Sequence, residues 1–322
     1  MNEIVRVEKL TKRYGDLIAV DGLSFEVREG EIFGFLGPNG AGKTTTLNII
    51  TTLADFDQGR VTIAGYDLVR DAREIKALIG LVPQEIAVYR ELTAQENVSF
   101  FASLYGLKGR ELKDAVGDAL AFVGLADAAK KRAGKMSGGM LRRLNIACGI
   151  AHQPKLIVMD EPTVGVDARS RDHIMSSIRV LRERGATIIY TSHYMPEVQD
   201  IADRIAIIDK GRLVAVGTEN ELLEYVTDFR TIELDVAGKD GEALRASAAA
   251  LGAMPGVRRA VYAEEAGMIR VDVDLNISDI TPVLRPILES GIRVSGVRTE
   301  APDLETTFLA LTGGALNEEV VL

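Results

Sequence analysis

The first part of this chain contains short, continuous runs of mainly apolar residues. These runs occupy residues 32–36, 156–159 and 187–190. Strands with this pattern are buried on both faces, as in a parallel sheet covered by helices. A fourth run at 205–208 precedes Asp209-Lys210-Gly211 and predicts a strand that enters a turn. We therefore expect an α/β fold with a mainly parallel sheet.

The hydrophobic pattern changes beyond about residue 226. Apolar residues now alternate with charged ones, first at 232–236 and again at 269–275. Alternation of this kind predicts half-exposed, antiparallel strands. Helices are expected at 241–252, 278–290 and 303–312. The order of strand, helix, strand, strand, helix, strand and helix predicts a small α+β, ferredoxin-like βαββαβ domain with one additional helix.

A third region, residues 84–150, has the apolar spacing of helices around Val98 and again around Leu120. We interpret it as a mostly helical insertion into the α/β domain. The predicted organisation is one domain over residues 1–225, which contains this helical subdomain, and an accessory domain over residues 226–322. A chain of 322 residues is long enough to form two cores of this kind.

Charge and cysteine content narrow the functional classes. The net charge of -9, from 38 basic and 47 acidic residues, argues against a nucleic-acid binder, because phosphate neutralisation requires clustered Lys and Arg. Cys148 is the only cysteine, so a reducing compartment is expected. The N-terminus lacks the apolar region of a signal peptide, and no stretch approaches the ~18 apolar residues of a membrane helix. If the protein works at a membrane, another chain must supply the span.

A glycine-rich loop follows the first apolar run and matches GxxxxGK[ST]. A helical segment at 45–52 comes next, which is the context that this phosphate-binding motif requires. The loop consists of Gly37, Pro38, Asn39, Gly40, Ala41, Gly42, Lys43 and Thr44. Glycines let the backbone wrap around phosphate oxygens, and the N–H groups of the helix start supply positive potential. We expect Lys43 to reach the β- and γ-phosphates and the Thr44 hydroxyl to bind Mg²⁺.

Two carboxylates, Asp160 and Glu161, end the second apolar run. They are expected at the carboxyl edge of the sheet, where open α/β folds bind ligands. Asp160 suits Mg²⁺ coordination through water, and Glu161 suits activation of the attacking water. His193 follows the next strand after a helix at 168–184, so it is expected at the same edge, within reach of a γ-phosphate. A lone histidine is also common in structural roles.

Three further features have weaker individual signals. Gln84 begins the helical insertion, and its amide could contact Mg²⁺ or water, although alone it would be read as a surface residue. Tyr14 could stack on a base, but an ordinary half-buried tyrosine fits the sequence nearly as well. Met136–Met140 contains Ser-Gly-Gly, which alone predicts a turn. Between the glycine-rich loop and the two carboxylates, it suggests the second half of a nucleotide site.

Together these residues resemble the ATP-binding cassette (ABC) ATPases over about residues 3–225, because seven elements occur in the family's order. The elements are the adenine-stacking Tyr14, the Walker A loop Gly37–Thr44 followed by Thr45, the Q-loop Gln84, the signature Met136–Met140, the Walker B Asp160 with the catalytic Glu161, the D-loop Asp167 and the switch histidine His193. The resemblance implies a P-loop NTPase fold that binds ATP and Mg²⁺ with these residues. It implies a metal site at Thr44, Gln84 and Asp160, and catalysis by Lys43, Glu161 and His193.

The resemblance also implies a head-to-tail dimer. Each ATP would lie between the Walker A loop of one subunit and Ser137, Gly138 and Gly139 of the other. The signature departs from the usual LSGGQ because Met136 and Met140 replace Leu and Gln, while the residues expected at the phosphate are retained. Complete motifs in one chain favour a homodimer over pairing with a paralogue.

The segment 303–313 resembles the closing segment of daunorubicin-resistance-type exporter ATPases, as does Glu-Pro-Thr-Val-Gly-Val-Asp at 161–167. This resemblance implies a subunit at the cytoplasmic face of the cell membrane. It would drive a separate transmembrane permease that exports drugs, antibiotics, lipids or ions, with contacts near 89–104.

The alternative is a soluble ABC ATPase of DNA repair or translation, although the sequence has neither long coiled coils nor a second cassette. The accessory domain could be a small-molecule sensor, but dimer stabilisation or partner contact is preferred.

Overall fold

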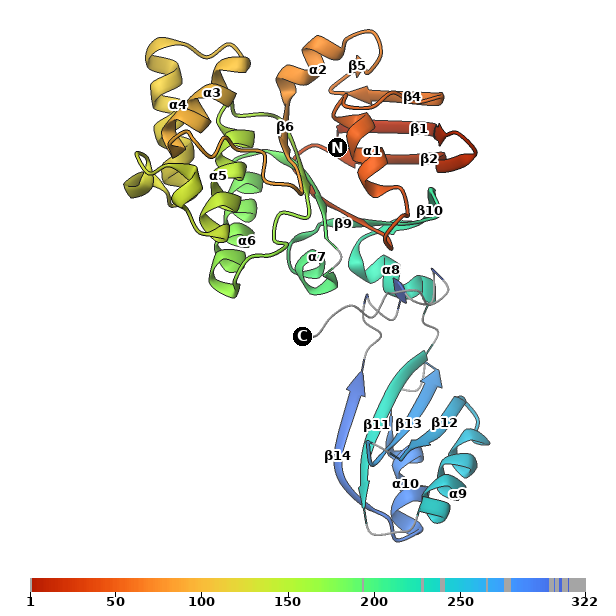
Figure 1. Cartoon of the computed structure of the whole chain (residues 1–322). Helices are drawn as coiled ribbons and strands as arrows, with labels where there is room; N and C mark the ends of the chain where they lie inside the picture. Colours follow the sequence, from red (N-terminus) through yellow and green to blue (C-terminus); the bar gives the residue numbers. More distant parts are fainter. Residues whose placement is uncertain are drawn as a thin grey trace. The chain divides into compact units, whose positions relative to one another are not determined.

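The computed structural model describes residues 2–192, 194–226, 229–237, 241–264, 266–274 and 279–300, together with positions 304, 307, 308 and 312. The chain divides into two compact units, one formed by residues up to Glu219 and the other by Asn220–Gly314 (Figure 1). Each unit has its own hydrophobic core. The domain boundary between residues 225 and 226 stays a prediction.

A mainly parallel sheet forms the centre of the first unit. Its strand order is β10-β9-β3-β8-β7-β6, and neighbours are parallel except for β10 and β9. The strands are β3 (Ile32–Leu36), β6 (Ile79–Val82), β7 (Leu156–Asp160), β8 (Thr187–Thr191), β9 (Arg204–Asp209) and β10 (Arg212–Gly217). Strands β3, β7 and β8 are buried at every position, as their uninterrupted apolar sequences predict.

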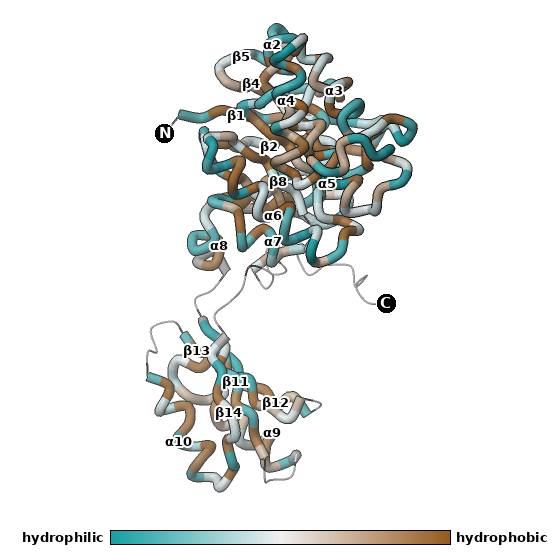
Figure 2. The backbone as a smooth tube through the Cα atoms, turned by 90° about the vertical axis from the view of Figure 1, so that its left-hand side faces the viewer, coloured by the Kyte–Doolittle hydropathy of each residue, from teal (hydrophilic) through white to brown (hydrophobic). Residues whose placement is uncertain are grey.

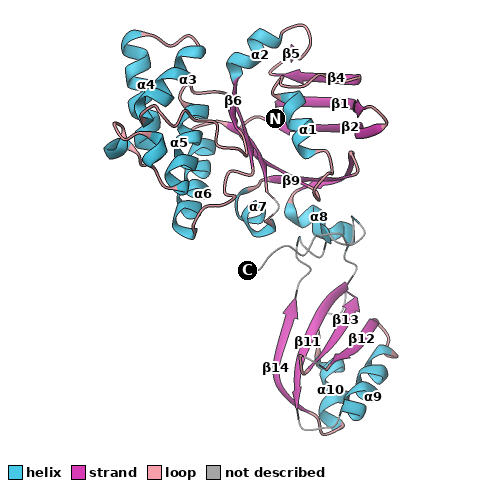
Figure 3. Ribbon diagram, in the orientation of Figure 1, coloured by secondary structure: helices cyan, strands magenta, loops and turns pink. Residues whose placement is uncertain are grey.

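Helices connect these strands and build the insertion (Figure 3). The connecting helices are α1 (Lys43–Ile50), α2 (Ala72–Leu78), α6 (Ala168–Glu183) and α7 (Met195–Ile201). The insertion contains α3 (Ala94–Leu104), α4 (Gly109–Phe122), the short 3-10 helices η1 (Ala126–Ala128) and η2 (Ala133–Lys135), and α5 (Gly138–Ile150). The predicted helical part of the fold is therefore confirmed, and its bounds at residues 84 and 150 stay a prediction. Cys148 in α5 is buried, and burial raises the pKa of its thiol to about 12, so it packs as a small apolar residue.

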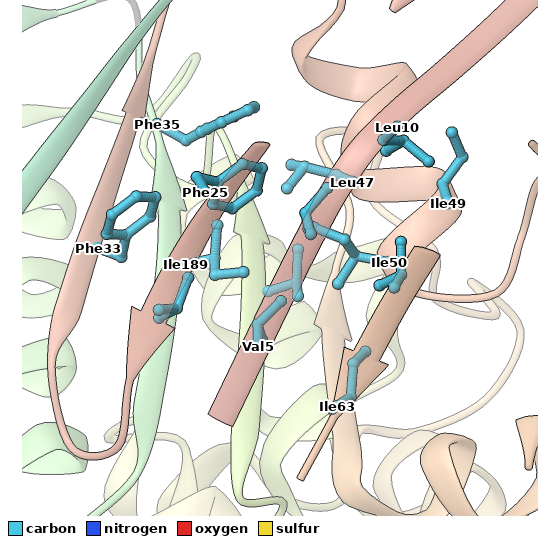
Figure 4. Packing of buried hydrophobic residues seen from close by; sticks show 14 of the residues in the cluster. Val5, Leu10, Phe25, Phe33, Phe35, Leu47, Ile49, Ile50, Ile63 and Ile189 are labelled. Carbon is cyan, nitrogen blue, oxygen red and sulfur yellow. The ribbon is translucent and has the colours of Figure 1, made fainter. Parts of the chain in front are cut away.

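A second, antiparallel sheet lies against the parallel one and was not anticipated from the sequence. Its order is β2-β1-β4-β5, with β1 (Glu3–Tyr14), β2 (Leu17–Arg28), β4 (Gln58–Ile63) and β5 (Tyr66–Asp67). Hydrophobic and hydrophilic positions alternate along β1 in the tube of Figure 2, and its apolar residues Ile4, Val5, Val7 and Leu10 are buried. Val5 and Leu10 of β1 share one core with Leu47 of α1 and with Phe33 and Phe35 of β3 (Figure 4). Helix α1 is thereby held by both sheets, which determines where the glycine-rich loop before it lies.

The second unit is built around an antiparallel sheet of order β12-β13-β11-β14. Its elements are β11 (Phe229–Ala237), α9 (Gly241–Gly252), β12 (Val257–Ala263), β13 (Met268–Asp274), α10 (Thr281–Glu289) and β14 (Arg293–Glu300), and α8 (Glu219–Val226) precedes them. Ile232 and Leu234 of β11 pack with Leu244 of α9 and Ile287 of α10. The chain order and the alternation confirm the predicted βαββαβ arrangement. Positions 304, 307, 308 and 312 are helical, and the rest of the helix predicted at 303–312 lies outside the described residues.

The burial of His152 in the first unit lowers the pKa of its ring, and this makes the stability of the protein depend on pH. Its ring stacks on Tyr105 with centroids 3.5 Å apart, and burial lowers the pKa of His152 to about 4. An unfolded histidine titrates near pH ~6.5, so between about pH 6.5 and 4 the unfolded chain binds a proton that the folded chain does not, and stability falls as pH falls. From pH 7 to pH 5, we expect the wild type to lose about 1–2 kcal/mol more unfolding free energy than His152→Phe. Urea unfolding at both pH values measures the difference, and equal losses would contradict this origin.

Candidate functional site

The glycine-rich loop connects the end of β3 to the start of α1. Gly42, the last residue before the helix, has φ of 97°, and a Cβ there would lie 2.3 Å from the carbonyl oxygen of Ala19. Only glycine fits both this left-handed backbone and this close approach. Gly40 has φ of 81° but faces open space, with nothing within 4 Å of the position of a Cβ. The loop is therefore closely packed on one side and accessible to a ligand at Gly40.

Lys43 contributes a positive charge inside this loop. Its Nζ donates hydrogen bonds to the carbonyl oxygens of Gly37 at 2.7 Å and Pro38 at 3.1 Å, and the residue is only 7% exposed. Burial lowers the pKa of Lys43, and the nearby charges of Glu161 and Asp160 oppose that shift. Its partners in the loop are neutral carbonyls, so the ammonium group retains its attraction for a polyanion at the start of α1. This arrangement fits the phosphates of a nucleotide.

The first carboxylate of the pair lies beside α1. Asp160 is the last residue of β7, and its Oδ2 accepts a hydrogen bond of 3.4 Å from the hydroxyl of Thr44. Its Oδ1 accepts a second one of 2.6 Å from Thr191 at the end of β8. A hydroxyl and a carboxylate so close together are hard oxygen ligands of the kind that Mg²⁺ takes alongside phosphate and water. The residues present therefore fit a phosphate-bound Mg²⁺.

The second carboxylate is held in a less favourable backbone conformation. Glu161 has φ of 46°, in the left-handed region, which costs about 1–3 kcal/mol for a residue other than glycine. Its N–H group donates to the hydroxyl of Thr191 at 3.0 Å and to the carbonyl oxygen of Thr191 at 3.2 Å. Its Oε2 accepts a 3.0 Å hydrogen bond from the amide of Gln84. The structure thus brings Gln84, Asp160, Glu161 and the glycine-rich loop into one site.

The segment Met136–Met140 begins helix α5. Ser137 is the N-cap residue, and its hydroxyl accepts a hydrogen bond of 3.3 Å from the N–H of Met140. Ser137 and Gly138 are exposed, whereas Gly139 is buried. A Cβ on Gly139 would lie 2.1 Å from the Oγ of Ser170 in α6. The second glycine is therefore required by the approach of α6 in the same subunit, and the exposed surface is formed by Ser137 and Gly138.

The remaining predicted residues occupy different surroundings. Asp167 is the N-cap of α6 and accepts a 2.9 Å hydrogen bond from the N–H of Ser170. Tyr14 ends β1 and is 51% exposed, with the Lys12 ammonium 5.2 Å from its ring centroid. The other loop positions are exposed at Asn39, partly buried at Pro38 and Thr45, and buried at Ala41. His193 lies outside the described residues.

Sequence reasoning missed Arg142, which connects the segment around Gln84 to α5. Arg142 is 4% exposed, and its guanidinium donates to the carbonyl oxygens of Pro83 at 3.2 Å, Gln84 at 2.7 Å and Val164 at 3.4 Å. Burial lowers the pKa of Arg142, while the charge of Glu161 raises it. Polar residues within the mainly apolar stretch 141–150 are a signal that could have been noticed, but the partners of Arg142 lie 22 to 59 residues away and are not visible in the sequence.

Aromatic side chains form an exposed surface on α3 and the loop before it. Tyr89 is 48% exposed and Phe100 is 39% exposed, and their rings meet edge to face with centroids 5.1 Å apart. Leu104, at the end of the same helix, is 65% exposed. Apolar surface gathered in this way is typical of a protein–protein contact.

Neither a membrane-spanning helix nor a cluster of metal ligands occurs among the described residues. In the part of the chain that the structure describes, no helix has both the length and the apolar character needed to cross a bilayer. The described residues also contain no group of three or more His, Cys, Asp and Glu side chains that could hold a metal. A Mg²⁺ site of the phosphate-bound kind needs only one or two carboxylates from the protein.

Three kinds of comparison show which known proteins this chain resembles. A family model described as ABC transporter matches residues 20–164. The linearmycin resistance ATP-binding protein LnrL of Bacillus subtilis (strain 168) is 39% identical over 321 residues, covering 98% of this chain and 100% of that protein. The daunorubicin resistance ATP-binding protein DrrA2 of Streptomyces coeruleorubidus is 38% identical over 309 residues, covering 96% and 95%. A solved dimer of the ATP-binding cassette MJ0796, in a post-hydrolysis state bound to ADP and Pi, matches with a TM-score of 0.61 and 27% identity, covering 66% and 98%.

Proposed function

Because the chain belongs to the ABC transporter family of ATP-binding proteins, we propose that it is the ATP-hydrolysing subunit of a bacterial exporter and drives a separate membrane permease. The observation that carries the proposal is the convergence of Lys43, Asp160 and Glu161 at one end of the parallel sheet. The DNA-repair and translation alternative is not supported, since the full-length relatives are named as resistance ATP-binding proteins.

The loop residues are proposed to bind the phosphates of ATP. Lys43 supplies the charge and the N-terminal N–H groups of α1 supply hydrogen bonds, while the accessible surface at Gly40 lets the phosphates approach the backbone. Tyr14, exposed on its hairpin, is proposed to stack on the adenine. Thr44, Asp160 and Gln84 are proposed to hold Mg²⁺, which neutralises phosphate charge when bound. The relative bound to ADP and Pi supports a nucleotide ligand for this fold.

Glu161 is proposed to position and deprotonate the water that attacks the γ-phosphate. Its carboxylate is 9% exposed, and its backbone is held by Thr191 in a conformation that a free chain rarely adopts. Strain of this kind is found at catalytic positions, where the surrounding structure over-determines the backbone. His193 is proposed as a γ-phosphate contact on the sequence pattern alone.

The working unit is proposed to be a head-to-tail homodimer, with a paralogue as the alternative partner. The exposed Ser137 and Gly138 at the N-terminus of α5 would face the γ-phosphate bound to the other subunit. Gly139 would serve this surface indirectly, by allowing α6 to approach. The solved dimer of a similar protein supports a dimeric working unit.

The aromatic surface formed by Tyr89, Phe100 and Leu104 is proposed to receive the permease at the cytoplasmic face of the cell membrane. The names of the relatives favour drugs and antibiotics as the exported class. The second unit is proposed to stabilise the dimer or to contact the permease.

An experiment on the intact complex tests the proposal. The chain is tagged and expressed in its own host, purified from detergent-solubilised membranes together with any polytopic protein bound to it, and assayed for ATP hydrolysis and for daunorubicin accumulation in cells. We expect co-purification, ATPase activity and lower drug accumulation. A chain that purifies alone and leaves accumulation of daunorubicin, linearmycin and related drugs unchanged would refute the exporter function.

A further inference from the structure

A buried carboxylate behind the site is used by none of the proposed roles. Glu197 of α7 is 5% exposed, yet three hydroxyl donors and one guanidinium, from three segments of the chain, meet it. Its Oε2 accepts hydrogen bonds from the hydroxyls of Thr163 at 2.7 Å, Tyr190 at 2.7 Å and Ser192 at 3.0 Å. Its Oε1 lies 3.1 Å from Nε of Arg171 on α6, as an ion pair.

A carboxylate buried so completely is costly unless its oxygens are satisfied. Moving an ion out of water costs several kcal/mol, and only well-placed hydrogen bonds offset that cost. Tyr190 remains a neutral donor, because burial and the charge of Glu197 both raise the pKa of its phenol. Three hydrogen bonds to Oε2 and one ion pair at Oε1 therefore hold Glu197, and they restrict the positions of the segments that supply the partners.

Those segments carry the proposed catalytic residues. Thr163 lies two residues after Glu161. Its hydrogen bond to Glu197 therefore restrains the loop that follows Glu161 in the chain. Tyr190 and Ser192 flank Thr191, which donates to Asp160 and accepts from the N–H of Glu161. Glu197 thus holds the end of β8, which orients Asp160 and Glu161, and it also holds the loop that follows Glu161.

We propose that Glu197 is a positioning residue for ATP hydrolysis, which holds the ends of β7 and β8 in the register that orients Asp160 and Glu161. The proposal rests on the proposed function, because it assigns a role in the same reaction. Glu197 acts through Thr163, Tyr190 and Ser192 and contacts no reacting atom.

The test compares Glu197→Gln with Asp200→Asn in the full-length chain. A glutamine oxygen can replace Oε2 as the acceptor, but its NH₂ group then faces Arg171 and the charge is lost, so the network loosens while the shape is kept. Asp200 is on the same helix, half-exposed and paired with Arg179, so its variant is a matched control. We expect Glu197→Gln to lower kcat at least 10-fold with the KM for ATP within twofold, and Asp200→Asn to change neither.

A second variant keeps the proposal testable if Glu197→Gln does not fold. Thr163→Val removes one donor at nearly constant volume, and we expect kcat to fall at least threefold with ATP binding unchanged. The proposal is overturned if either folded variant keeps kcat within twofold, or if kcat and ATP affinity fall in parallel. If the wild type has no ATPase activity, the proposed function is overturned as well. If the wild type is active and both variants have the same kcat, only the role of Glu197 is overturned.

Discussion

Replacing Glu161 by Gln is expected to lower kcat for ATP hydrolysis by a factor of about 100 or more while ATP still binds. A general base contributes 10²–10⁴-fold to a reaction, and an amide cannot accept the proton. The substitution preserves shape, and its carbonyl oxygen can still accept the hydrogen bond from Gln84. The effect should therefore appear in kcat, with the ATP dissociation constant changed by less than about threefold. Steady-state ATPase kinetics and titration with a fluorescent ATP analogue measure the two quantities.

The same variant tests the dimer proposal. If the γ-phosphate holds two subunits together, a subunit that binds but cannot hydrolyse ATP should accumulate as an ATP-dependent dimer, which size-exclusion chromatography detects. Glu111→Gln, at an exposed position on α4, is the matched control and should behave as the wild type. Residual activity above about one tenth of the wild-type kcat would exclude Glu161 as the essential base.

Gly42→Ala is expected to weaken ATP binding by a factor on the order of 100, equivalent to about 2.7 kcal/mol. The left-handed backbone costs alanine about 1–2 kcal/mol, and the new methyl group would lie 2.3 Å from the Ala19 carbonyl oxygen. Ala19 precedes Val20, which is part of the core around α1, so the strand stays in place and the loop moves. Loop movement displaces Lys43 and the first N–H groups of α1 from the phosphates. Isothermal titration with ATP measures the loss.

Gly30→Ala separates backbone strain from loop displacement. Gly30 has φ of 78° in the turn between β2 and β3, but a Cβ there meets nothing within 4 Å. Its variant should lose stability of about 1 kcal/mol and retain ATP affinity within twofold. Should Gly42→Ala bind ATP as well as Gly30→Ala does, the close contact with Ala19 would not control the loop.

Elements with a strong local signal were predicted well. The apolar runs of β3, β7 and β8 require burial on both faces, so their sequences alone indicate a parallel sheet. The antiparallel sheet of β1, β2, β4 and β5 was missed because strand β1 pairs with β4 across more than 40 residues, and nothing local in either strand identifies its partner.

The sequence by itself determined the chemistry of the site, since the spacing of Gly37–Thr44 and the order of Gln84, Asp160 and Glu161 indicate a nucleotide-binding chain before any fold is known. Only the tertiary structure decided which residues hold the site residues in position. Arg142 reaches Gln84 across 58 residues, Thr191 reaches Asp160 across 31, and Glu197 reaches Thr163 across 34. Motif residues are constrained by the ligand and therefore recur in a recognisable spacing. Supporting residues are constrained by which chain segments pack together, and that proximity exists only once the sheets and helices have assembled.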